Sequence, residues 1–311
     1  MDNPVGILYD KTNPNFGDRA IGLAMKQVLA QNGIPCVDLP NRDVLSGFKT
    51  STVIVGGGQV IRKLHGPNET FYDIFRVPGK NILNSCGTTP NADQLDYLKD
   101  YRYVTVRSQM DYDIIKTIRP DAQIAPCSAL ALNAQQTKPP EIPEGSILLI
   151  HVFLPITPDI TGLANSLDKA LPYKKVLVCF TPHYTKYLDQ LEIITGWPRI
   201  REDDPAKLVA LIEHPRVVGT ISSSLHATLF TYRAGKPFLV YPSDPKMPAF
   251  LSERGMLPRL WTADMTPEEV ARRFFLNQQQ ISTEWRKDRQ KLDQHLTQLI
   301  THCRFSLKES K

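Results

Sequence analysis

The sequence predicts an α/β protein with two Rossmann-like domains that face a cleft, followed by a C-terminal amphipathic helix. Three observations support this prediction. Short apolar runs alternate with helical patterns, which is typical of parallel sheets covered by helices. The alternation stops at one proline-rich segment and then begins again. The chain has 311 residues, which suits two domains of roughly 100–200 residues each.

The first half of the chain contains four apolar runs that predict strands. They lie at residues 5–9, 52–55, 81–85 and 103–106. A helix is expected over residues 18–32, because its apolar residues fall at helical spacing and Gly33 follows as a stop signal. Residues 92–99 predict a further helical stretch, between the third and fourth strands.

The second half repeats this pattern after a break. Residues 133–145 contain three prolines, few large apolar residues and no periodicity, so they predict an interdomain linker. Strands are then expected at residues 147–152, 175–180, 217–218 and 238–241, and helices at about residues 160–170, 183–191, 205–213 and 225–234.

These elements define the expected domains. We expect an N-terminal Rossmann-like domain at residues 1–135, a linker at 136–145, a C-terminal Rossmann-like domain at 146–265 and a helical tail at 266–311. In open parallel sheets ligands bind outside the carboxyl ends of the strands. Candidate site residues are therefore sought in the loops that follow the strands.

The tail combines an apolar helix face with a basic surface. Thr266 followed by Pro267 predicts a helix N-terminus. The apolar face consists of Ile281, Trp285, Leu292, Leu296, Leu299, Ile300 and Cys303. The chain's net charge of +5 resides entirely in residues 271–311, which hold nine basic and four acidic residues. Two interpretations are open: a terminal helix that packs across the other domain, or a basic surface on anionic lipid headgroups.

Composition limits the protein class. Five cysteines without a C-x-x-C pair favour a reducing compartment. No apolar run reaches the roughly 18–20 residues of a membrane span, and the N-terminus lacks a basic leader, so we expect a cytoplasmic protein. Without an H-E-x-x-H motif, and with its seven histidines scattered, the chain predicts no metal site. We also expect no nucleic-acid partner, because no basic patch interleaved with aromatics occurs outside the tail.

Several loops of the first half carry candidate site residues. Asn15, Gly17 and Asp18 lie where the first strand leads into the first helix, whose N-terminus favours negative charge. Three consecutive glycines, Gly56, Gly57 and Gly58, follow the second strand. They would allow a ligand or a facing loop to pack on backbone amides. Asp18 could also be only a helix cap.

Two more loops of the first half carry polar groups. Thr88 lies in the Ser-Cys-Gly-Thr-Thr segment after the third strand, where hydroxyls and amides suit a phosphate or a sugar. A tight turn explains the same residues. Arg107 ends the fourth strand, and its guanidinium could clamp a carboxylate or phosphate, or pair with a local acid such as Asp111.

The second half places a histidine at a strand-to-helix junction. Ser222, Ser223 and Ser224 end a strand, and Leu225 and His226 open the next helix. In a first helical turn the dipole lowers imidazole basicity and the free amides attract anions. His226 is therefore a candidate acid or base. Lys246, expected in the loop after the following strand, could contact a phosphate or carboxylate.

Taken together, these residues resemble the polysaccharide pyruvyl transferase family over most of the chain, to about Leu260. The matching motifs are Asn15-x-Gly17-Asp18, Gly56-Gly57-Gly58, Arg107 with Ser108, Leu225-His226-Ala227, Gly235-x-Pro237, and Tyr241-x-x-Asp244-Pro245-Lys246 with Phe250-Leu251 and Gly255. The resemblance implies a GT-B-like fold. It also implies transfer of a pyruvyl group from phosphoenolpyruvate to a sugar as a ketal, without a further cofactor.

The resemblance also implies roles and partners. His226 would be the general acid/base, and Arg107 and Lys246 would clamp anions beside Ser223, Ser224 and Leu225. The acceptor side would be shaped by Asn15, Gly17, Asp18, Thr88 and Gly56–Gly58. The acceptor would be a cell-surface polysaccharide sugar or a lipid-linked precursor, which fits a protein at the inner membrane face through its basic helix.

The sequence departs from the family where many members carry Met-Arg-Leu-His. Here Ser224 occupies the Arg position, so another cation such as Arg107, Lys246, Arg62 or Arg19 would have to bind the donor. The acidic residue that commonly follows the family's Arg is also absent after Arg107. Two alternatives stay open: a GT-B glycosyltransferase that uses a nucleotide sugar, and a non-catalytic sugar- or anion-binding relative.

Overall fold

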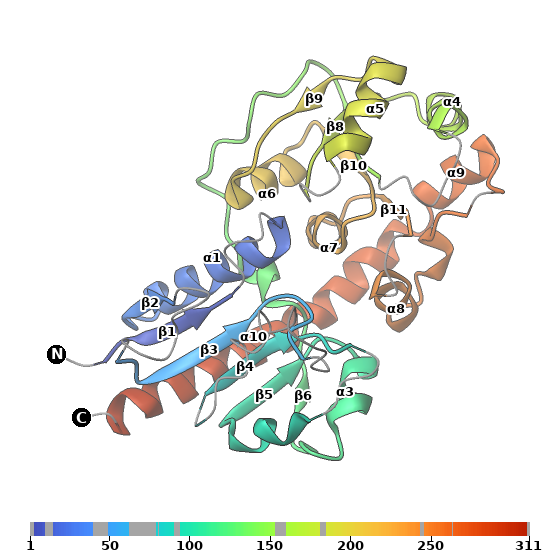
Figure 1. The fold of residues 1–311 in the computed structure, drawn as a ribbon. Helices are drawn as coiled ribbons and strands as arrows, with labels where there is room; N and C mark the ends of the chain where they lie inside the picture. The colour runs from blue at the N-terminus through green and yellow to red at the C-terminus, as the bar shows by residue number, and fades with distance from the viewer. Residues whose placement is uncertain are drawn as a thin grey trace. The chain divides into compact units, whose positions relative to one another are not determined.

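A computed structural model describes residues 3–9, 15–39, 49–61, 79, 81–89, 94–152, 160–180, 185–242, 246–262 and 264–309. It contains two compact units (Figure 1). The first comprises the N-terminal strand, Gly17–Asn133 and Asp288–Lys311. The second comprises Ala134–Lys287 and the short segment that ends at Phe16. Each unit is built around one parallel sheet, which confirms the predicted α/β class.

The first sheet has six parallel strands in the order β2-β1-β3-β4-β5-β6. These strands are β1 (Val5–Leu8), β2 (Cys36–Asp38), β3 (Thr52–Gly56), β4 (Ile82–Cys86), β5 (Tyr103–Val106) and β6 (Gln123–Ile124). The four predicted strands of this half are confirmed to within one or two residues. Residues of β1, β3, β4 and β5 are buried, as the apolar runs required.

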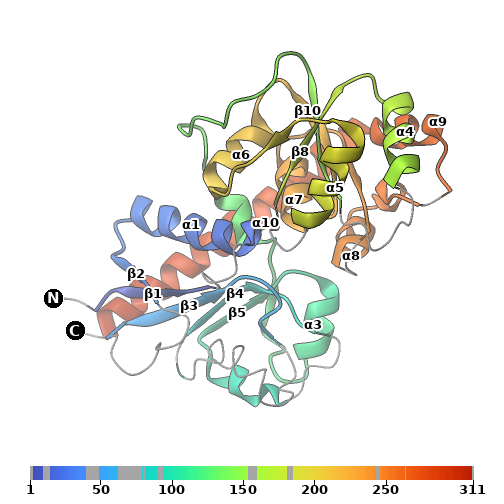
Figure 2. The ribbon, with the colours of Figure 1, turned by 45° about the horizontal axis from the view of Figure 1, so that its top comes forward.

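The helices of the first unit cover both faces of its sheet (Figure 2). Helix α1 (Phe16–Gln31) begins two residues earlier than predicted, and α3 (Gln109–Ile115) follows β5. The helical stretch predicted at residues 92–99 is a 3₁₀-helix at Leu95–Asp100 instead, and residues 91–93 lie outside the described part. Its Leu95 and Leu98 pack in one core with strand residues such as Val55 and Leu83.

The second sheet has five parallel strands in the order β11-β10-β7-β8-β9. These are β7 (Ile147–His151), β8 (Lys174–Val178), β9 (Arg199–Ile200), β10 (Val217–Ser222) and β11 (Phe238–Val240). The helices are α4 (Ile160–Ala170), α5 (Thr185–Thr195), α6 (Pro205–Glu213), α7 (Leu225–Arg233), α8 (Lys246–Glu253) and α9 (Pro267–Phe274). The predicted bounds of α4 and α6 match, whereas β10 is four residues longer than predicted.

Helix α10 (Gln278–Glu309) belongs to both units, which divide between Lys287 and Asp288. Of its predicted apolar face, Ile281, Leu292, Leu299, Ile300 and Cys303 are buried, whereas Trp285 and Leu296 are half-buried. Because the protein itself covers this face, the structure agrees with the first of the two interpretations, a terminal helix that packs on the protein. None of the helices in the described part is long and apolar enough to cross a membrane.

Candidate functional site

Each sheet has a point where the strand order reverses, and such switch points are where open parallel sheets bind ligands. In the first sheet the chain runs from β1 to β2 on one side and from β3 onward on the other. In the second sheet β8 and β9 lie on one side of β7, and β10 and β11 on the other. The switch points are therefore the ends of β1 and β3, and the ends of β7 and β10.

The predicted glycine loop lies at the first switch point, against Asp18. Gly57 and Gly58 have φ angles of 106° and 62°, which L side chains rarely adopt. A Cβ atom on either residue would lie 3.4 or 3.3 Å from Oδ1 of Asp18. Asp18 is 6% exposed and occupies the first turn of α1, rather than the cap position that was its alternative interpretation. The loop thus needs glycines for its backbone and for its close approach to this carboxylate.

Backbone hydrogen bonds join this loop to the loop after β4. The amide of Gly87 donates to the carbonyl of Gly58 at 3.0 Å, and the amide of Ile61 donates to the carbonyl of Gly87 at 3.1 Å. The amide of Thr89 then donates to the carbonyl of Ile61 at 2.8 Å. Two of the predicted site loops therefore form one rigid ledge at the end of the sheet.

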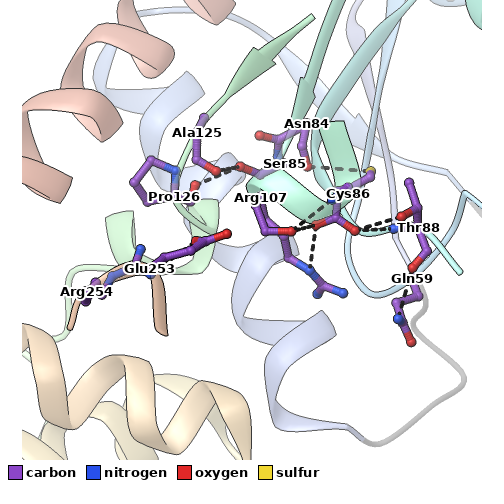
Figure 3. A network of polar contacts seen from close by, with 12 residues as sticks. Gln59, Asn84, Ser85, Cys86, Thr88, Arg107, Ala125, Pro126, Glu253 and Arg254 are labelled. Atoms are coloured by element: carbon purple, nitrogen blue, oxygen red, sulfur yellow. Dashed lines mark hydrogen bonds and ion pairs between the residues drawn. The ribbon is translucent and has the colours of Figure 1, made fainter. Parts of the chain in front are cut away.

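Arg107 lies on this ledge, with its guanidinium against Gly87. A Cβ atom on Gly87 would lie 2.0 Å from Nη2 and 2.4 Å from Cζ of Arg107, so only glycine leaves room for the guanidinium. The Nε atom is 3.8 Å from Oδ2 of Asp111, an ion pair longer than a hydrogen bond (Figure 3). Nη2 is buried and donates no hydrogen bond to any of the described residues. A buried cationic donor in this state is suited to an anionic ligand.

Asp111 is held by three groups besides Arg107. Its Oδ1 accepts from the amide of Thr88 at 2.7 Å and from the hydroxyl of Thr88 at 2.9 Å. Its Oδ2 accepts from the hydroxyl of Ser108 at 2.5 Å. Thr88 is fully buried, so its hydroxyl, predicted for the acceptor side, here positions Asp111 (Figure 3).

The backbone of β4 is irregular just before the ledge, where its register against β5 shifts. Ser85 has a φ angle of 50°, which is uncommon for a residue other than glycine. Its hydroxyl is within hydrogen-bond distance of the carbonyl oxygens of Ala125 and Pro126, at 2.9 and 2.7 Å. These contacts, visible in Figure 3, hold the strained residue in place and aim Gly87 beneath Arg107.

Two buried thiols report the electrostatics of the ledge. Burial raises the pKa of Cys86 to about 12 and that of Cys127 to about 11. Arg107 opposes both shifts, and Asp18 adds to the rise at Cys127. Arg107 and Asp18 therefore have opposite electrostatic effects on the pKa of the Cys127 thiol. Both thiols are protonated at neutral pH, which makes them unsuited to act as nucleophiles.

The second switch point holds the predicted serines and His226. Ser224 is the N-cap of α7, and its hydroxyl accepts from the amide of Ala227 at 3.4 Å. The hydroxyl of Ser222 accepts from the amide of Ser224 at 2.9 Å. His226 is the second residue of α7 and is 7% exposed, while Leu225 is half-buried. The predicted position of His226 in a first helical turn is thus confirmed.

Sequence reasoning missed His151, which ends β7 at the same switch point. Its carbonyl accepts from the amide of Ser223 at 2.7 Å, so it fixes the serine loop. Burial lowers the pKa of its imidazole to about 4, and Arg199 contributes. A histidine as the last residue of a buried strand was the signal that could have found it.

Other predicted residues fall elsewhere. Lys246 is the first residue of α8, not a loop residue as predicted, because that helix begins directly after the undescribed residues 243–245. Asn15 is partly exposed just before α1, and Gly17 is buried within its first turn. Arg19 is partly exposed on α1, and Arg62 lies outside the described residues.

Asp111 and Asp113 are two residues apart on α3, a spacing that could supply cation ligands. The structure separates them: Asp113 is exposed and accepts from the ammonium group of Lys116 at 2.7 Å, whereas Asp111 is buried. Among the residues that the structure describes, no group of three His, Cys, Asp or Glu side chains is placed to hold a metal ion.

Comparison with protein families gives one match over residues 15–245, to the family described as "Polysaccharide pyruvyl transferase". That range includes the glycine loop, Arg107 and His226. No protein with a curated description matches the chain.

Solved structures of similar fold share little sequence with the chain. A functionally uncharacterised Klebsiella pneumoniae protein is 16% identical over 84% of this chain and 94% of its own, with a TM-score of 0.52. Arabidopsis thaliana UGT89C1 complexed with quercetin is 10% identical over 97% and 100%, with a TM-score of 0.57. UDP-GlcNAc 2-epimerase from Neisseria meningitidis, bound to UDP-GlcNAc, is 11% identical over 96% and 98%, with a TM-score of 0.53. These likenesses confirm the GT-B-like fold class and nothing finer.

Proposed function

Because the chain belongs to the polysaccharide pyruvyl transferase family, we propose that it transfers a pyruvyl group from phosphoenolpyruvate to a sugar of a cell-surface polysaccharide or its precursor, forming a ketal. The observation that carries the proposal is that the family's motifs fall on both switch points, with the glycine loop after β3 and His226 after β10. These are the positions where sheets of this topology bind ligands.

The reaction requires proton transfer and anion binding. Protonation of the terminal CH2 of phosphoenolpyruvate gives an oxocarbenium-like centre at C2, to which one sugar hydroxyl adds. A second hydroxyl of the same sugar then displaces phosphate and closes the ketal ring. One donor and one sugar diol thus give one ketal and one inorganic phosphate. General acid/base catalysis of such steps typically contributes roughly 10²–10⁴-fold.

His226 is the proposed acid/base. It lies in the first turn of α7, where the positive end of the helix dipole favours negative charge. Ser224 uses its hydroxyl as the helix cap, so the Arg that many family members carry at this position is replaced by a residue with a local structural task. The cation for the donor must then come from elsewhere in the chain.

Arg107 is the proposed replacement. Its Nη2 is buried and makes no hydrogen bond within the described part of the chain, and its pairing with Asp111 at 3.8 Å leaves it able to bind a carboxylate or a phosphate. Lys246 is the second proposed clamp. It is the first residue of α8, and its ammonium group can bind a carboxylate or a phosphate as a point charge.

The acceptor side is assigned to the ledge and to the residues at the start of α1. Asn15, Gly17, Asp18 and Gly56–Gly58 would contact the sugar, and Thr88 would act by holding Asp111. Asp18 offers a carboxylate that could orient a sugar hydroxyl beside backbone amides. No cofactor besides phosphoenolpyruvate as co-substrate is needed for this chemistry.

The acceptor is proposed to be a sugar or a lipid-linked oligosaccharide at the cytoplasmic side of the inner membrane. Support comes from six exposed cations on α10, which are Arg286, Lys287, Arg289, Lys291, Arg304 and Lys308. The apolar face of α10 is already covered, so such peripheral contact would be electrostatic, worth roughly 1 kcal/mol per cation near an anionic surface.

The test is release of inorganic phosphate from phosphoenolpyruvate in the presence of a panel of acceptor sugars and lipid-linked analogues, with nuclear magnetic resonance of the product for a ketal carbon. We expect phosphate release that depends on an acceptor, and thermal stabilisation by phosphoenolpyruvate. Stabilisation by a nucleoside diphosphate instead would favour the glycosyltransferase alternative. Donor binding without phosphate release would favour a non-catalytic relative.

A further inference from the structure

We propose that the cavity at the carboxyl ends of β8 and β9 binds one uncharged sugar unit of the acceptor saccharide. This inference rests on the proposed function for the acceptor's identity, but the site itself is built from contacts within the second unit. The cavity measures about 320 Å³, which lies at the lower end of the roughly 300–1,000 Å³ typical of small-molecule sites. Strands β8 and β9 form one edge of the second sheet (Figure 1).

Aromatic rings form one wall of this cavity. Phe180 follows β8, and Phe16 packs on it with ring centroids 5.3 Å apart and planes tilted by 50°. The amide of Phe16 also donates to the carbonyl of Phe180 at 3.2 Å, which fixes the pair. Such rings offer an apolar surface on which the C–H face of a sugar ring can pack.

Arg199 also lines the cavity and has a donor without a partner among the described residues. Its side chain is only 5% exposed, and Nη1 pairs with the carboxylates of Asp189 and Glu192 on α5. Its Nε atom is buried and makes no hydrogen bond among the described residues. Since buried polar groups nearly always have partners, an oxygen of a bound ligand is the natural acceptor for this donor.

The charges around the cavity favour a neutral ligand. Arg199 and Arg201 line it together with Glu202 and Asp203. Behind them Glu192 pairs with Arg201 at 2.9 Å, and Lys207 pairs with Glu202 at 3.1 Å. Because the cations are already matched by carboxylates, a phosphate or a carboxylate would meet repulsion. A sugar hydroxyl, which both donates and accepts, suits such mixed walls.

The cavity is connected to the loop that carries the proposed donor groups. Phe180 packs edge-on against His151 with ring centroids 5.5 Å apart, and the carbonyl of His151 accepts from the amide of Ser223. One histidine therefore separates the cavity wall from the serine loop before α7. A sugar held in the cavity would place the adjoining part of the acceptor beside that loop.

Cys179 makes the proposal testable without catalysis. It is partly exposed, lines the cavity and lies 3.6 Å from the hydroxyl of Thr185. We would measure the rate at which N-ethylmaleimide modifies Cys179, by mass spectrometry of its peptide. The probes are methyl glycosides of glucose, galactose, mannose and N-acetylglucosamine. Cys36, which is partly exposed in the first unit, is the internal reference.

We expect at least one glycoside to slow the modification of Cys179 saturably while Cys36 reacts at an unchanged rate. Thr185 lines the cavity, so its hydroxyl can bind the sugar. The Thr185→Val variant should therefore require roughly two- to tenfold more glycoside for equal protection of Cys179, because this hydrogen-bond partner of the sugar is lost. Gln190→Ala, an exposed change on the same helix, should behave as wild type.

Equal rates at Cys179 with and without every glycoside would overturn the proposal. So would protection that Thr185→Val leaves unchanged, or protection by uridine diphosphate or inorganic phosphate that no glycoside reproduces. The assay uses no donor and no turnover. Failure to release phosphate therefore counts against the proposed function alone, and failure to protect Cys179 counts against this cavity alone.

Discussion

At the scale of single residues, Arg107 is positioned by three strand ends rather than by one partner. Gly87 from the loop after β4 gives it room, and Asp111 from the helix after β5 forms an ion pair with it. Gly58 from the loop after β3 holds Gly87 through a 3.0 Å hydrogen bond. Asp111 in turn depends on Thr88. The ledge therefore positions one guanidinium group, that of Arg107.

Gly87→Ala tests whether the ledge positions Arg107. Its new Cβ would meet Nη2 of Arg107 at 2.0 Å, so the guanidinium must move. We expect kcat/KM for phosphoenolpyruvate to fall roughly 10- to 100-fold, which corresponds to the roughly 1.5–3 kcal/mol of a charged hydrogen bond. Arg107→Ala should cause a similar loss, and the double variant should be little worse than either. Additive losses would show that the glycine and the arginine act separately.

The sequence predicted Arg107 and the glycine loop because strand ends and consecutive glycines are local signals. It could not predict that Gly87 is the residue beneath Arg107. That fact depends on the register of β4 against β5, which shifts between Leu83 and Cys86. Long-range pairing of this kind leaves no mark on either segment alone.

At the scale of elements, the buried face of helix α10 contains polar as well as apolar side chains. Asp288, His295 and Ser306 are buried on the same face as Leu292 and Leu299. Nε2 of His295 lies 2.8 Å from Oδ1 of Asn84 on β4, and its Nδ1 lies 3.0 Å from the hydroxyl of Tyr103 on β5. Apolar periodicity predicted the helix, but the partners of His295 lie about 200 positions away in sequence.

This histidine predicts a pH dependence confined to the first unit. Burial lowers its pKa from 6.5 to about 4. Between these values the unfolded chain binds a proton that the folded protein does not, so stability falls as the pH drops from 6.5 towards 4. The loss by pH 5 is roughly 2 kcal/mol relative to pH 7.

Hydrogen exchange of the amides in β4 and β5 measures this loss. We expect their protection, corrected for intrinsic rates, to fall about 30-fold more in wild type than in His295→Gln, which keeps hydrogen bonding without titrating in this range. Tryptophan fluorescence is the control: Trp197, Trp261 and Trp285 all lie in the second unit, so its change with pH should be the same in the two proteins. If amide protection in β4 and β5 fell with pH equally in wild type and in His295→Gln, the lowered pKa of His295 would be contradicted.

Elements with continuous buried runs were predictable, and short edge elements were not. The residues of β7 are all buried and its bounds follow from sequence. By contrast β6 has two exposed residues, and β9 also has only two. Helix α3 buries only Asp111 and Ile115 among its seven residues. Without an apolar pattern, such elements form only because a neighbouring strand or core is already in place.

At the scale of the whole molecule, two sheets of the same class have different strand orders. The first places β3 beside β1, and the second places β10 beside β7. The alternation of strands and helices predicted two parallel sheets but not these orders, because order is decided by which strands pair across long loops. Both orders nevertheless create a switch point, and the predicted motifs occupy both.

The central claim is that His226, at the switch point of the second sheet, is the acid/base of a phosphoenolpyruvate-dependent transfer. The most direct test compares phosphate release from phosphoenolpyruvate by wild type and His226→Ala, with an acceptor present and with circular dichroism melting as the check of folding. We expect the variant to melt as a folded protein and to lose at least about 100-fold in turnover. Near wild-type turnover in a folded His226→Ala protein would contradict the claim.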